Sequence, residues 1–197
     1  MTTLSADYSA AAISRRFESI ADFRIELANI DATLLWDKNT LVASVISTAQ
    51  NPNGRYPVLA SLELEQTDWK DKTAAYAVER FWEKESMQVR GVVTDPSRRD
   101  MGLATYIYET LVLKLGFTLV SDNEQYEGGK ALWKKIAAHS RKLNVYVLDS
   151  DTLDFHPYGK DGRTIYTGSN IDDVELWSID PDQSKYGIVL VAEPVAA

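Results

Sequence analysis

The chain has no cysteine and only two histidines, His139 and His156. A disulfide framework, thiolate zinc sites and a thiol nucleophile are therefore excluded, and nothing in the sequence indicates an oxidising compartment. The histidines show neither an HExxH motif nor another paired spacing, so we expect no metal site.

Long apolar runs are also missing. No stretch approaches the roughly 20 apolar residues that a membrane span needs. The start of the chain, MTTLSADYSAAAISRRFESI, lacks the cationic region and the apolar stretch of a signal peptide. We therefore expect a protein that is neither membrane-anchored nor exported, with the cytoplasm as its default location.

Positively charged residues are fewer than negatively charged ones. The chain has 21 Lys and Arg residues and 29 Asp and Glu residues, which gives a net charge of -8. The acidic residues are spread along the chain and would repel a phosphate backbone, so direct binding of nucleic acid is not expected. An acidic surface favours a cationic substrate such as an amine or a lysine, although acidity also serves solubility alone.

Three motifs are incomplete. The acidic run DSDTLD has Leu153 and Asp154 where an EF-hand loop needs an oxygen ligand and a glycine. The segment GGK at residues 128–130 lacks the earlier glycine and the following Ser or Thr of a nucleotide-binding loop, and no GxSxG elbow occurs. Calcium, nucleotide-loop and serine-hydrolase functions are thereby disfavoured.

The N-terminal half contains both helical and strand-like patterns of apolar residues. Ile13, Phe17 and Ile20 recur at helical spacing behind Ser9, which predicts an amphipathic helix with a serine cap. ATLLWDKNTLVASVIS predicts a hairpin that turns at residues 37–39. VLASLELEQ alternates and predicts a half-exposed antiparallel strand whose Val58, Ala60, Leu62 and Leu64 share one face. The stretch 69–86 fits a helix or a strand equally well.

The C-terminal half alternates strands and helices. We expect a strand over residues 87–94, a helix over 102–115, a strand in FTLVS, a helix in GGKALWKKIAAHS and a strand in LNVYVL, with at least one parallel pair. Gly91 indicates a bulge or a ligand that approaches the backbone closely. Residues 151–184 predict a loop-rich excursion with TIYT and VELWSI as strand candidates, and YGIVLVA a final strand.

We expect one domain over residues 1–197, with four parts. They are an N-terminal helix, hairpin and strand region (1–86), a core (87–148), the loop-rich excursion (151–184) and a final strand with a tail (185–197).

The segment RRDMGLA carries the clearest chemical signal. Arg99, Gly102 and Ala104 form the pattern R-x-x-G-x-A directly after a buried strand. Free N–H groups converge where a helix begins, and together with the helix dipole they favour a phosphate or pyrophosphate. The small Gly102 and Ala104 let a ligand approach the backbone, and Arg98 or Arg99 can add a charge-assisted contact.

In its context, VVTDPSRRDMGLATYIYETLVLKLGFTLVSD resembles motif A of the GCN5-related N-acetyltransferase (GNAT) superfamily. The likeness covers residues 87–148, and the first half of the chain fits the family only loosely. With GGKALWKKIA included, the chain looks most like bacteriophage members, which would place it in the host cytoplasm. The resemblance implies an α/β (α+β) fold: a mixed, mostly antiparallel central sheet, splayed at the cofactor cleft and flanked by helices.

The resemblance also implies acetyl-CoA as co-substrate, with no metal. Backbone N–H groups of the helix start would hold the pyrophosphate, and the strand edge before it would pair with the pantetheine arm, where Val92 or Val93 could polarise the thioester carbonyl. The cofactor-binding residues implied in this way are Val92, Val93, Thr94, Arg98, Arg99, Asp100, Met101, Gly102, Leu103, Ala104, Thr105 and Trp133.

The acid and base are poorly marked. Glu83 and Glu85 are the candidate bases, because Gln88 stands where some relatives carry a glutamate and cannot accept a proton. Members of the family often place a tyrosine that acts as general acid where Trp133 stands. Tyr126 is therefore the candidate general acid in this chain. For each of these residues a solvated or packing role is the competing interpretation.

Three functions follow from these observations. The first is an N-acetyltransferase that acts on a primary amine of a small molecule or a protein. The second is a catalytically impaired GNAT-fold module that binds CoA or a protein, for example a phage protein that modulates a host partner. The third, a structural or inhibitory protein without CoA, leaves R-x-x-G-x-A unexplained. The acceptor and the oligomeric state, a homodimer included, stay open.

Overall fold

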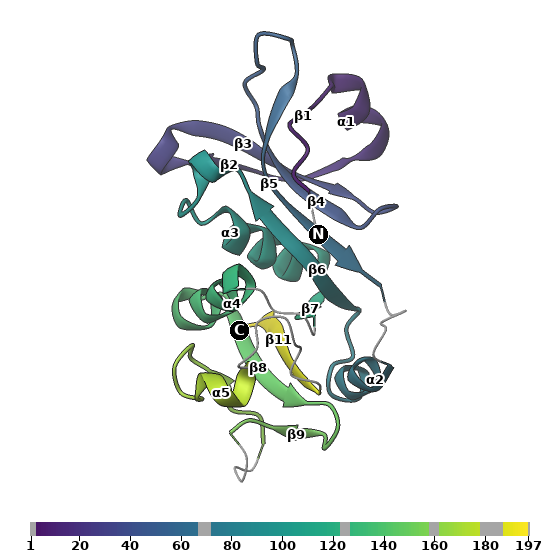
Figure 1. The fold of residues 1–197 in the computed structure, drawn as a ribbon. Coiled ribbons are helices and arrows are strands. Elements are labelled where there is room, and N and C mark those ends of the chain that lie inside the picture. The colour runs from purple at the N-terminus through teal and green to yellow at the C-terminus, as the bar shows by residue number, and fades with distance from the viewer. Residues whose placement is uncertain (1–2, 67–71, 123–126, 158–161, 178–186, 197) are drawn as a thin grey trace. The chain divides into compact units, whose positions relative to one another are not determined.

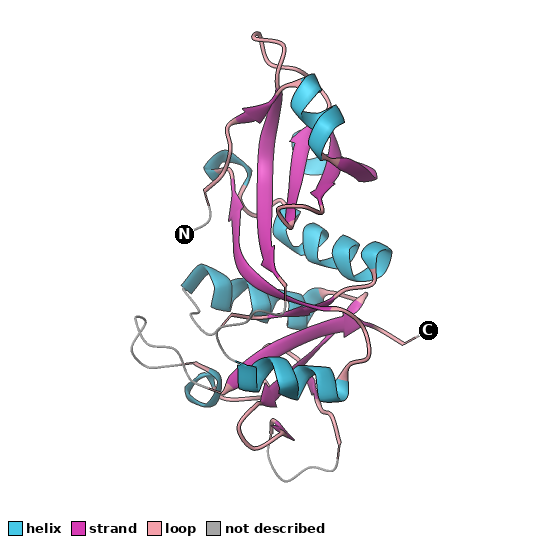
Figure 2. Cartoon of the chain, turned by 90° about the vertical axis from the view of Figure 1, so that its right-hand side faces the viewer, coloured by secondary structure: helices cyan, strands magenta, loops and turns pink. Residues whose placement is uncertain are grey.

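The computed structural model of the chain describes residues 3–66, 72–122, 127–157, 162–177 and 187–196. In these ranges it contains five α-helices and eleven strands, and most neighbouring strands are antiparallel (Figure 1). The mixed α/β class with a large, mostly antiparallel sheet is therefore as predicted. Contacts group the residues into unit 1, which is Met1–Leu64 and Arg90–Thr110, and unit 2, which is Glu65–Val89 and Leu111–Ala197. Figure 2 shows the helices and strands by colour. Both kinds of element occur in each unit.

Unit 1 is built on consecutive antiparallel strands. Its strands are β1 (Asp7–Tyr8), β2 (Glu18–Ile25), β3 (Ile30–Asp37), β4 (Val42–Ser47), β5 (Tyr56–Glu65) and the second half of β6 (Ser86–Thr94). Its helices are α1 (Ala10–Arg16) and α3 (Leu103–Thr110), with 3₁₀ turns at Glu26–Ala28 and Pro96–Arg98. β2, β3, β4 and β5 pair in chain order, and β1 pairs with β5. The predicted hairpin between β3 and β4 is thereby confirmed.

The first helix begins where the sequence predicts. The Ser9 side chain accepts a hydrogen bond from the backbone N–H of Ala12 at 3.2 Å, which satisfies one of the orphan donors of the first turn. The helix ends at Phe17, whose backbone is extended. Ile20 therefore lies on β2 and not on the helix, so the predicted helix was one turn too long at its C-terminal end.

A bulge in β5 changes which residues share a face. Val45 of β4 pairs with Ala60, but Ile46 pairs with Val58, so Leu59 is an extra residue in the ladder. Val58 consequently leaves the face of Ala60 and packs with Phe17 and other residues beside α1. Leu59 and Ser61 are also buried. The predicted half-exposed strand with a single apolar face was wrong because alternation stops at the bulge and both faces are covered.

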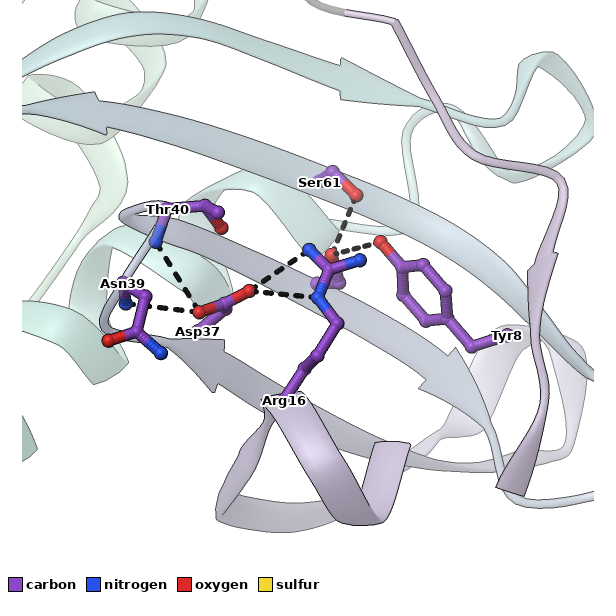
Figure 3. A network of polar contacts seen from close by, with 7 residues as sticks. Tyr8, Arg16, Asp37, Asn39, Thr40 and Ser61 are labelled. Carbon is purple, nitrogen blue, oxygen red and sulfur yellow. Dashed lines mark hydrogen bonds and ion pairs between the residues drawn. The ribbon is translucent and has the colours of Figure 1, made fainter. Parts of the chain in front are cut away.

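A polar network joins α1 to the strands of unit 1 (Figure 3). One carboxylate oxygen of Asp37 accepts hydrogen bonds from Nε and Nη2 of Arg16 at 3.2 and 3.0 Å. The other oxygen accepts from the backbone N–H groups of Asn39 and Thr40. Asp37 is 1% exposed, so these donors replace the water that the carboxylate loses. This arrangement fixes the turn between β3 and β4 and holds α1 on the sheet.

Unit 2 contains the remaining elements. Its strands are the first half of β6, β7 (Thr118–Val120), β8 (Leu143–Asp149), β9 (Asp154–Phe155), β10 (Ile165–Tyr166) and β11 (Ile188–Pro194). Its helices are α2 (Lys72–Phe81), α4 (Glu127–His139), α5 (Asp173–Leu176) and a π-helical turn, Leu111–Leu115, that directly follows α3. The hydrogen-bonded strand order is β10-β8-β11-β7-β6-β5-β4-β3-β2, in which β6 is divided between the units.

The order of strands in unit 2 contains the predicted parallel pair. β6 and β7 run parallel, from Ser86 opposite Thr118 to Gln88 opposite Val120. Ser121, just after β7, is 1% exposed, and its N–H and Oγ both bond to the backbone of Leu190 on β11. The Nε2 of Gln88 donates to the carbonyl oxygen of Ser121 at 3.3 Å. Hydrogen bonds between buried polar groups at Ser121 thus connect β6, β7 and β11.

Two segments of unit 2 were ambiguous or wrongly predicted from the sequence. The ambiguous stretch 69–86 contains helix α2, whose Ala74, Ala77 and Val78 are fully buried in a cluster with residues of β8 and β11. VELWSI was predicted as a strand, but its first residues lie in α5. Val174 is exposed, whereas Leu176, the last residue of α5, and the adjacent Trp177, whose backbone is extended, are both buried.

We expect Asp37→Asn to lower the free energy of unfolding at neutral pH by about 2 to 3 kcal/mol, the range for buried hydrogen bonds to a charged group. Burial alone would raise the pKa of Asp37, but hydrogen bonds from Thr40, Arg16 and Asn39 outweigh it and hold the pKa below its ordinary value of 3.8. The contribution of the ionised carboxylate is therefore complete above pH 3.8 and is lost as the pH falls through the folded pKa.

Urea unfolding at neutral pH and in steps below about pH 4 measures both effects, the second as a steeper acid loss in the wild type than in Asp37→Asn. Asp31→Asn is the matched control, because Asp31 pairs with Arg24 on the surface with 64% of its side chain exposed. Its effect should stay below about 1 kcal/mol. Equal losses in the two variants would show that the buried network does not stabilise unit 1.

Candidate functional site

The segment that follows β6 is a tight turn stabilised by its own side chains. Asp95 caps the 3₁₀ turn at Pro96–Arg98, and its carboxylate accepts hydrogen bonds from the N–H of Ser97 at 2.8 Å and from its Oγ at 2.6 Å. These hydrogen bonds from Ser97 lower the pKa of Asp95. The turn directs the chain from the end of β6 towards the start of α3.

Two residues with left-handed backbone precede α3. Asp100 has a φ of 63° and Gly102 a φ of 75°. A non-glycine residue in this region costs about 1 to 2 kcal/mol, although Asp tolerates it better than most. At Gly102 a Cβ atom would meet no heavy atom within 4 Å. The backbone angle therefore favours glycine at this position, and the space in front of it is open.

The first turn of α3 presents unpaired donors at its N-terminal end. The N–H of Tyr106 donates to the carbonyl oxygen of Gly102 at 2.9 Å, which is the first hydrogen bond of the helix. The N–H groups of Leu103, Ala104 and Thr105 precede it and have no acceptor within the helix. Their partial positive charge adds to the helix dipole, so the open space beside Gly102 favours an anion.

The side chains of the segment divide into core and surface. Leu103 and Ile107 are buried at 3% and 0% exposure and anchor α3, so Leu103 can offer a ligand only its backbone. Arg99 and Asp100 are exposed. The half-buried residues of the predicted site are Val92, Val93, Thr94, Arg98, Met101, Gly102, Ala104 and Thr105.

The strand edge of β6 offers further donors. The N–H of Asp95 donates to the carbonyl oxygen of Leu59 on β5 at 2.9 Å. Because successive residues of a strand present their N–H groups to opposite sides, the N–H of Val93 faces β5 as well. The N–H groups of Val92 and Thr94 face away from β5. Of the two oxyanion candidates predicted from the sequence, Val92 is thus the one whose donor is not directed at a neighbouring strand of unit 1.

The structure gathers the predicted binding residues 92–94 and 98–105 in unit 1 and places Glu83, Glu85 and Trp133 in unit 2. Glu83 and Glu85 are exposed, and Oε1 of Glu85 accepts a hydrogen bond from Gln66. Trp133 of α4 is only 2% exposed and is among the largest buried side chains. Its placement agrees with the packing role that competed with cofactor binding. Tyr126, the candidate acid, lies outside the described residues.

Sequence reasoning missed a group of aromatic residues in unit 2. Phe81, Trp82, Tyr146 and Phe155 surround the guanidinium of Arg163. Their separation along the chain hides the cluster, and the one available signal was the adjacent aromatic pair at the end of the ambiguous stretch 69–86.

Among the residues that the structure describes, no group of three or more His, Asp or Glu side chains could hold a metal ion. None of the helices in the described ranges combines the length and the apolar character that crossing a membrane requires.

No match was found when the chain was compared with protein-family models, with curated proteins and with solved structures.

Proposed function

We propose that this protein is an N-acetyltransferase of the GNAT type and that residues 92–105 form its acetyl-CoA site. The observation that carries the proposal is the geometry at Gly102. A left-handed glycine with open space before it heads a helix whose first N–H groups lack partners, and a strand edge with outward donors lies immediately upstream. A pyrophosphate joined to an extended pantetheine arm is a ligand that fits both features.

The residues divide the binding work between them. The N–H groups of Leu103, Ala104 and Thr105 hold the pyrophosphate, and Arg98 or Arg99 adds a charge-assisted contact. The donors of Val92 and Thr94 bond to the pantetheine arm or to the reacting carbonyl. In an otherwise acidic chain, this segment supplies local positive potential from backbone as much as from side chains.

The proposed reaction is the attack of a neutral primary amine on the thioester carbonyl carbon. The C–N bond forms, the C–S bond breaks, and the proton lost by the amine is balanced by protonation of the thiolate. The N–H of Val92 stabilises the negative charge that develops on the carbonyl oxygen. The sequence provides no marked acid or base, so exchange of both protons with solvent completes the proposal.

A binding module without catalysis is the second candidate, and two observations favour it. Trp133 is buried in the core, at a position where GNAT enzymes often have a tyrosine that acts as general acid. The side chain of Gln88 is hydrogen-bonded to the backbone of Ser121 inside the sheet. Neither residue can exchange a proton at neutral pH. Both candidates bind CoA, so binding tests the site and turnover distinguishes the functions.

We expect acetyl-CoA to raise the melting temperature of the wild type and to leave that of Gly102→Glu unchanged. At a ligand concentration of about 100 times Kd the gain is about 2.7 kcal/mol, which corresponds to roughly 5–10 °C for a chain of this size. The added carboxylate occupies the open space and opposes the phosphates. Differential scanning fluorimetry with and without acetyl-CoA measures the shift.

Gly116→Glu is the matched control for this experiment. Gly116 has a φ of 77°, also has no heavy atom within 4 Å of an added Cβ, and belongs to unit 2. Both variants therefore carry the same backbone strain and the same charge, but Gly116→Glu should retain the shift. The proposal fails if the wild type shows no shift, or if both variants lose it.

We expect Val92→Pro to fold and to bind acetyl-CoA, but to reduce kcat by about 10²–10³-fold, the loss typical for one oxyanion donor. Proline removes the N–H, which is tolerated where no strand accepts it. Val93→Pro should instead destabilise unit 1, because that N–H faces β5. Release of CoA thiol across a panel of amines measures turnover, and the chain, which lacks cysteine, gives no background with thiol reagents.

Binding of acetyl-CoA without thiol release from any amine would favour the binding module over the enzyme. Wild-type turnover in Val92→Pro would remove Val92 from the mechanism.

A further inference from the structure

Unit 2 contains a cluster of aromatic rings around one cation. We call the side chains of Phe81, Trp82, Tyr146 and Phe155 the aromatic cluster. The Cζ atom of Arg163 lies 4.4 Å from the centroid of the Trp82 ring and between 5.6 and 5.9 Å from the centroids of the other three. A cation within about 6 Å of an aromatic face is attracted by the ring quadrupole, and Trp is the strongest partner.

Hydrogen-bond acceptors complete the surroundings of this guanidinium. Nη2 of Arg163 donates to the backbone carbonyl oxygen of Phe81, and Nη1 lies 3.6 Å from Oε2 of Glu193. The same carboxylate oxygen accepts a hydrogen bond from Nε1 of Trp82 at 2.6 Å, which fixes its position. Rings, a carboxylate and a carbonyl thus contact one cation from several sides.

The cluster draws its members from three segments. Phe81 is the last residue of α2 and Trp82 follows it, Tyr146 lies on β8 and Phe155 on β9. The rings contact one another, with centroids 5.0 Å apart for Phe81 and Phe155 and 6.2 Å apart for Trp82 and Tyr146. Phe81 and Phe155 also pack on the buried core of unit 2. The cluster is therefore held in place by packing that does not depend on Arg163.

Arg163 is the exposed member of the arrangement. Its side chain is 32% exposed and that of Glu193 is 23% exposed, so the site is open to solvent on one side. Two residues further on, Ile165 pairs with Tyr146 in the ladder between β10 and β8 and anchors the backbone. Because Ile165 and Tyr166 hold the backbone against β8, rotation about the side-chain bonds of Arg163 can empty the site while β10 stays in place.

We propose that the aromatic cluster with Glu193 is a guanidinium-binding site that Arg163 fills within the chain and that an arginine side chain of another polypeptide enters when Arg163 turns outward. The guanidinium is the appropriate class of cation because it stacks on rings and also donates N–H groups to a carboxylate and a carbonyl. A quaternary ammonium has no such donors. The net charge of -8 favours a basic partner.

Arg163 then acts as a tethered competitor. Its effective concentration at the site is in the millimolar range or above, so it lowers the apparent affinity for a guanidinium from outside. Removal of Arg163 should expose the site to small cations in solution. This proposal is independent of acetyl-CoA binding, which concerns residues of unit 1.

The experiment uses Arg163→Ala and ethylguanidinium chloride at millimolar concentration, with sodium chloride at equal ionic strength as reference. Tryptophan fluorescence should titrate to saturation in Arg163→Ala, with an affinity at least about tenfold higher than in the wild type. The melting temperature of the variant should rise with ethylguanidinium. Guanidinium salts otherwise destabilise proteins, so a rise is the sign of specific binding.

Three comparisons sharpen the result. Tetramethylammonium should bind Arg163→Ala at least about tenfold more weakly, because it cannot donate hydrogen bonds. Arg163→Ala combined with Glu193→Gln should lose most of the ethylguanidinium binding. Arg80→Ala is the matched control: Arg80 also lies over the Phe81 ring, at 6.0 Å, but its removal leaves Arg163 in the site. It should bind no better than the wild type.

The proposal is overturned if folded Arg163→Ala does not bind ethylguanidinium, or if tetramethylammonium binds equally well. Arg163→Gln, which keeps a longer stem and two N–H donors, is made in parallel and should show intermediate binding. Failure of both variants to fold would also overturn it, because Arg163 would then be a structural part that cannot leave.

Discussion

Strand β6 is the element on which both units depend. Its first residues pair in parallel with β7 and complete the sheet of unit 2, while its last residues adjoin β5 and complete the sheet of unit 1. A parallel ladder requires a crossover connection between its strands, and the chain supplies it as α3 and the π-helical turn. The segment proposed to bind acetyl-CoA is the start of that crossover, so the fold and the site arise from one constraint.

Two buried polar residues, one in each unit, are hydrogen-bonded in a similar way. Asp37 in unit 1 and Ser121 in unit 2 are almost fully buried, and each collects hydrogen bonds from backbone groups and from one long side chain. Arg16 serves Asp37, and Gln88 serves Ser121. Both long side chains therefore compensate buried polar groups within the sheets.

Local signals in the sequence predicted most of the elements. The Ser9 cap, the hairpin turn at Asp37 and the helix after Gly102 were predictable because each depends on a few neighbouring residues. The bulge at Leu59 was not predictable, because it is a shift in the pairing of β5 with β4, and the sequence of β5 alone does not indicate it. VELWSI misled because so short a segment shows no full period: α5 is a single turn, and the adjacent Leu176 and Trp177 are buried where the helix gives way to extended backbone.

The candidate site also has a part that the sequence predicts and a part that it does not. Gly102 and the start of the helix could be predicted, because consecutive residues determine both the backbone conformation and the N–H donors there. Of Val92 and Val93, only the hydrogen bond from Asp95 to Leu59 distinguishes the outward donor, and that is a tertiary contact. The aromatic cluster around Arg163 is assembled from segments more than 60 residues apart, such as Trp82 and Tyr146, so periodicity could not reveal it.

Two short strands, β9 and β10, cover one edge of the sheet. β11 pairs with β8 along its whole length, so β9 and β10, which pair with Leu148–Asp149 and Val145–Tyr146, lie on the opposite edge of β8. A long, uncovered strand edge is a template for pairing with other chains, and natural proteins commonly blunt it with short strands. Two strands of two residues each cover this edge and offer little backbone of their own. At this edge of the sheet, little unpaired backbone is therefore left to which another chain could add a strand.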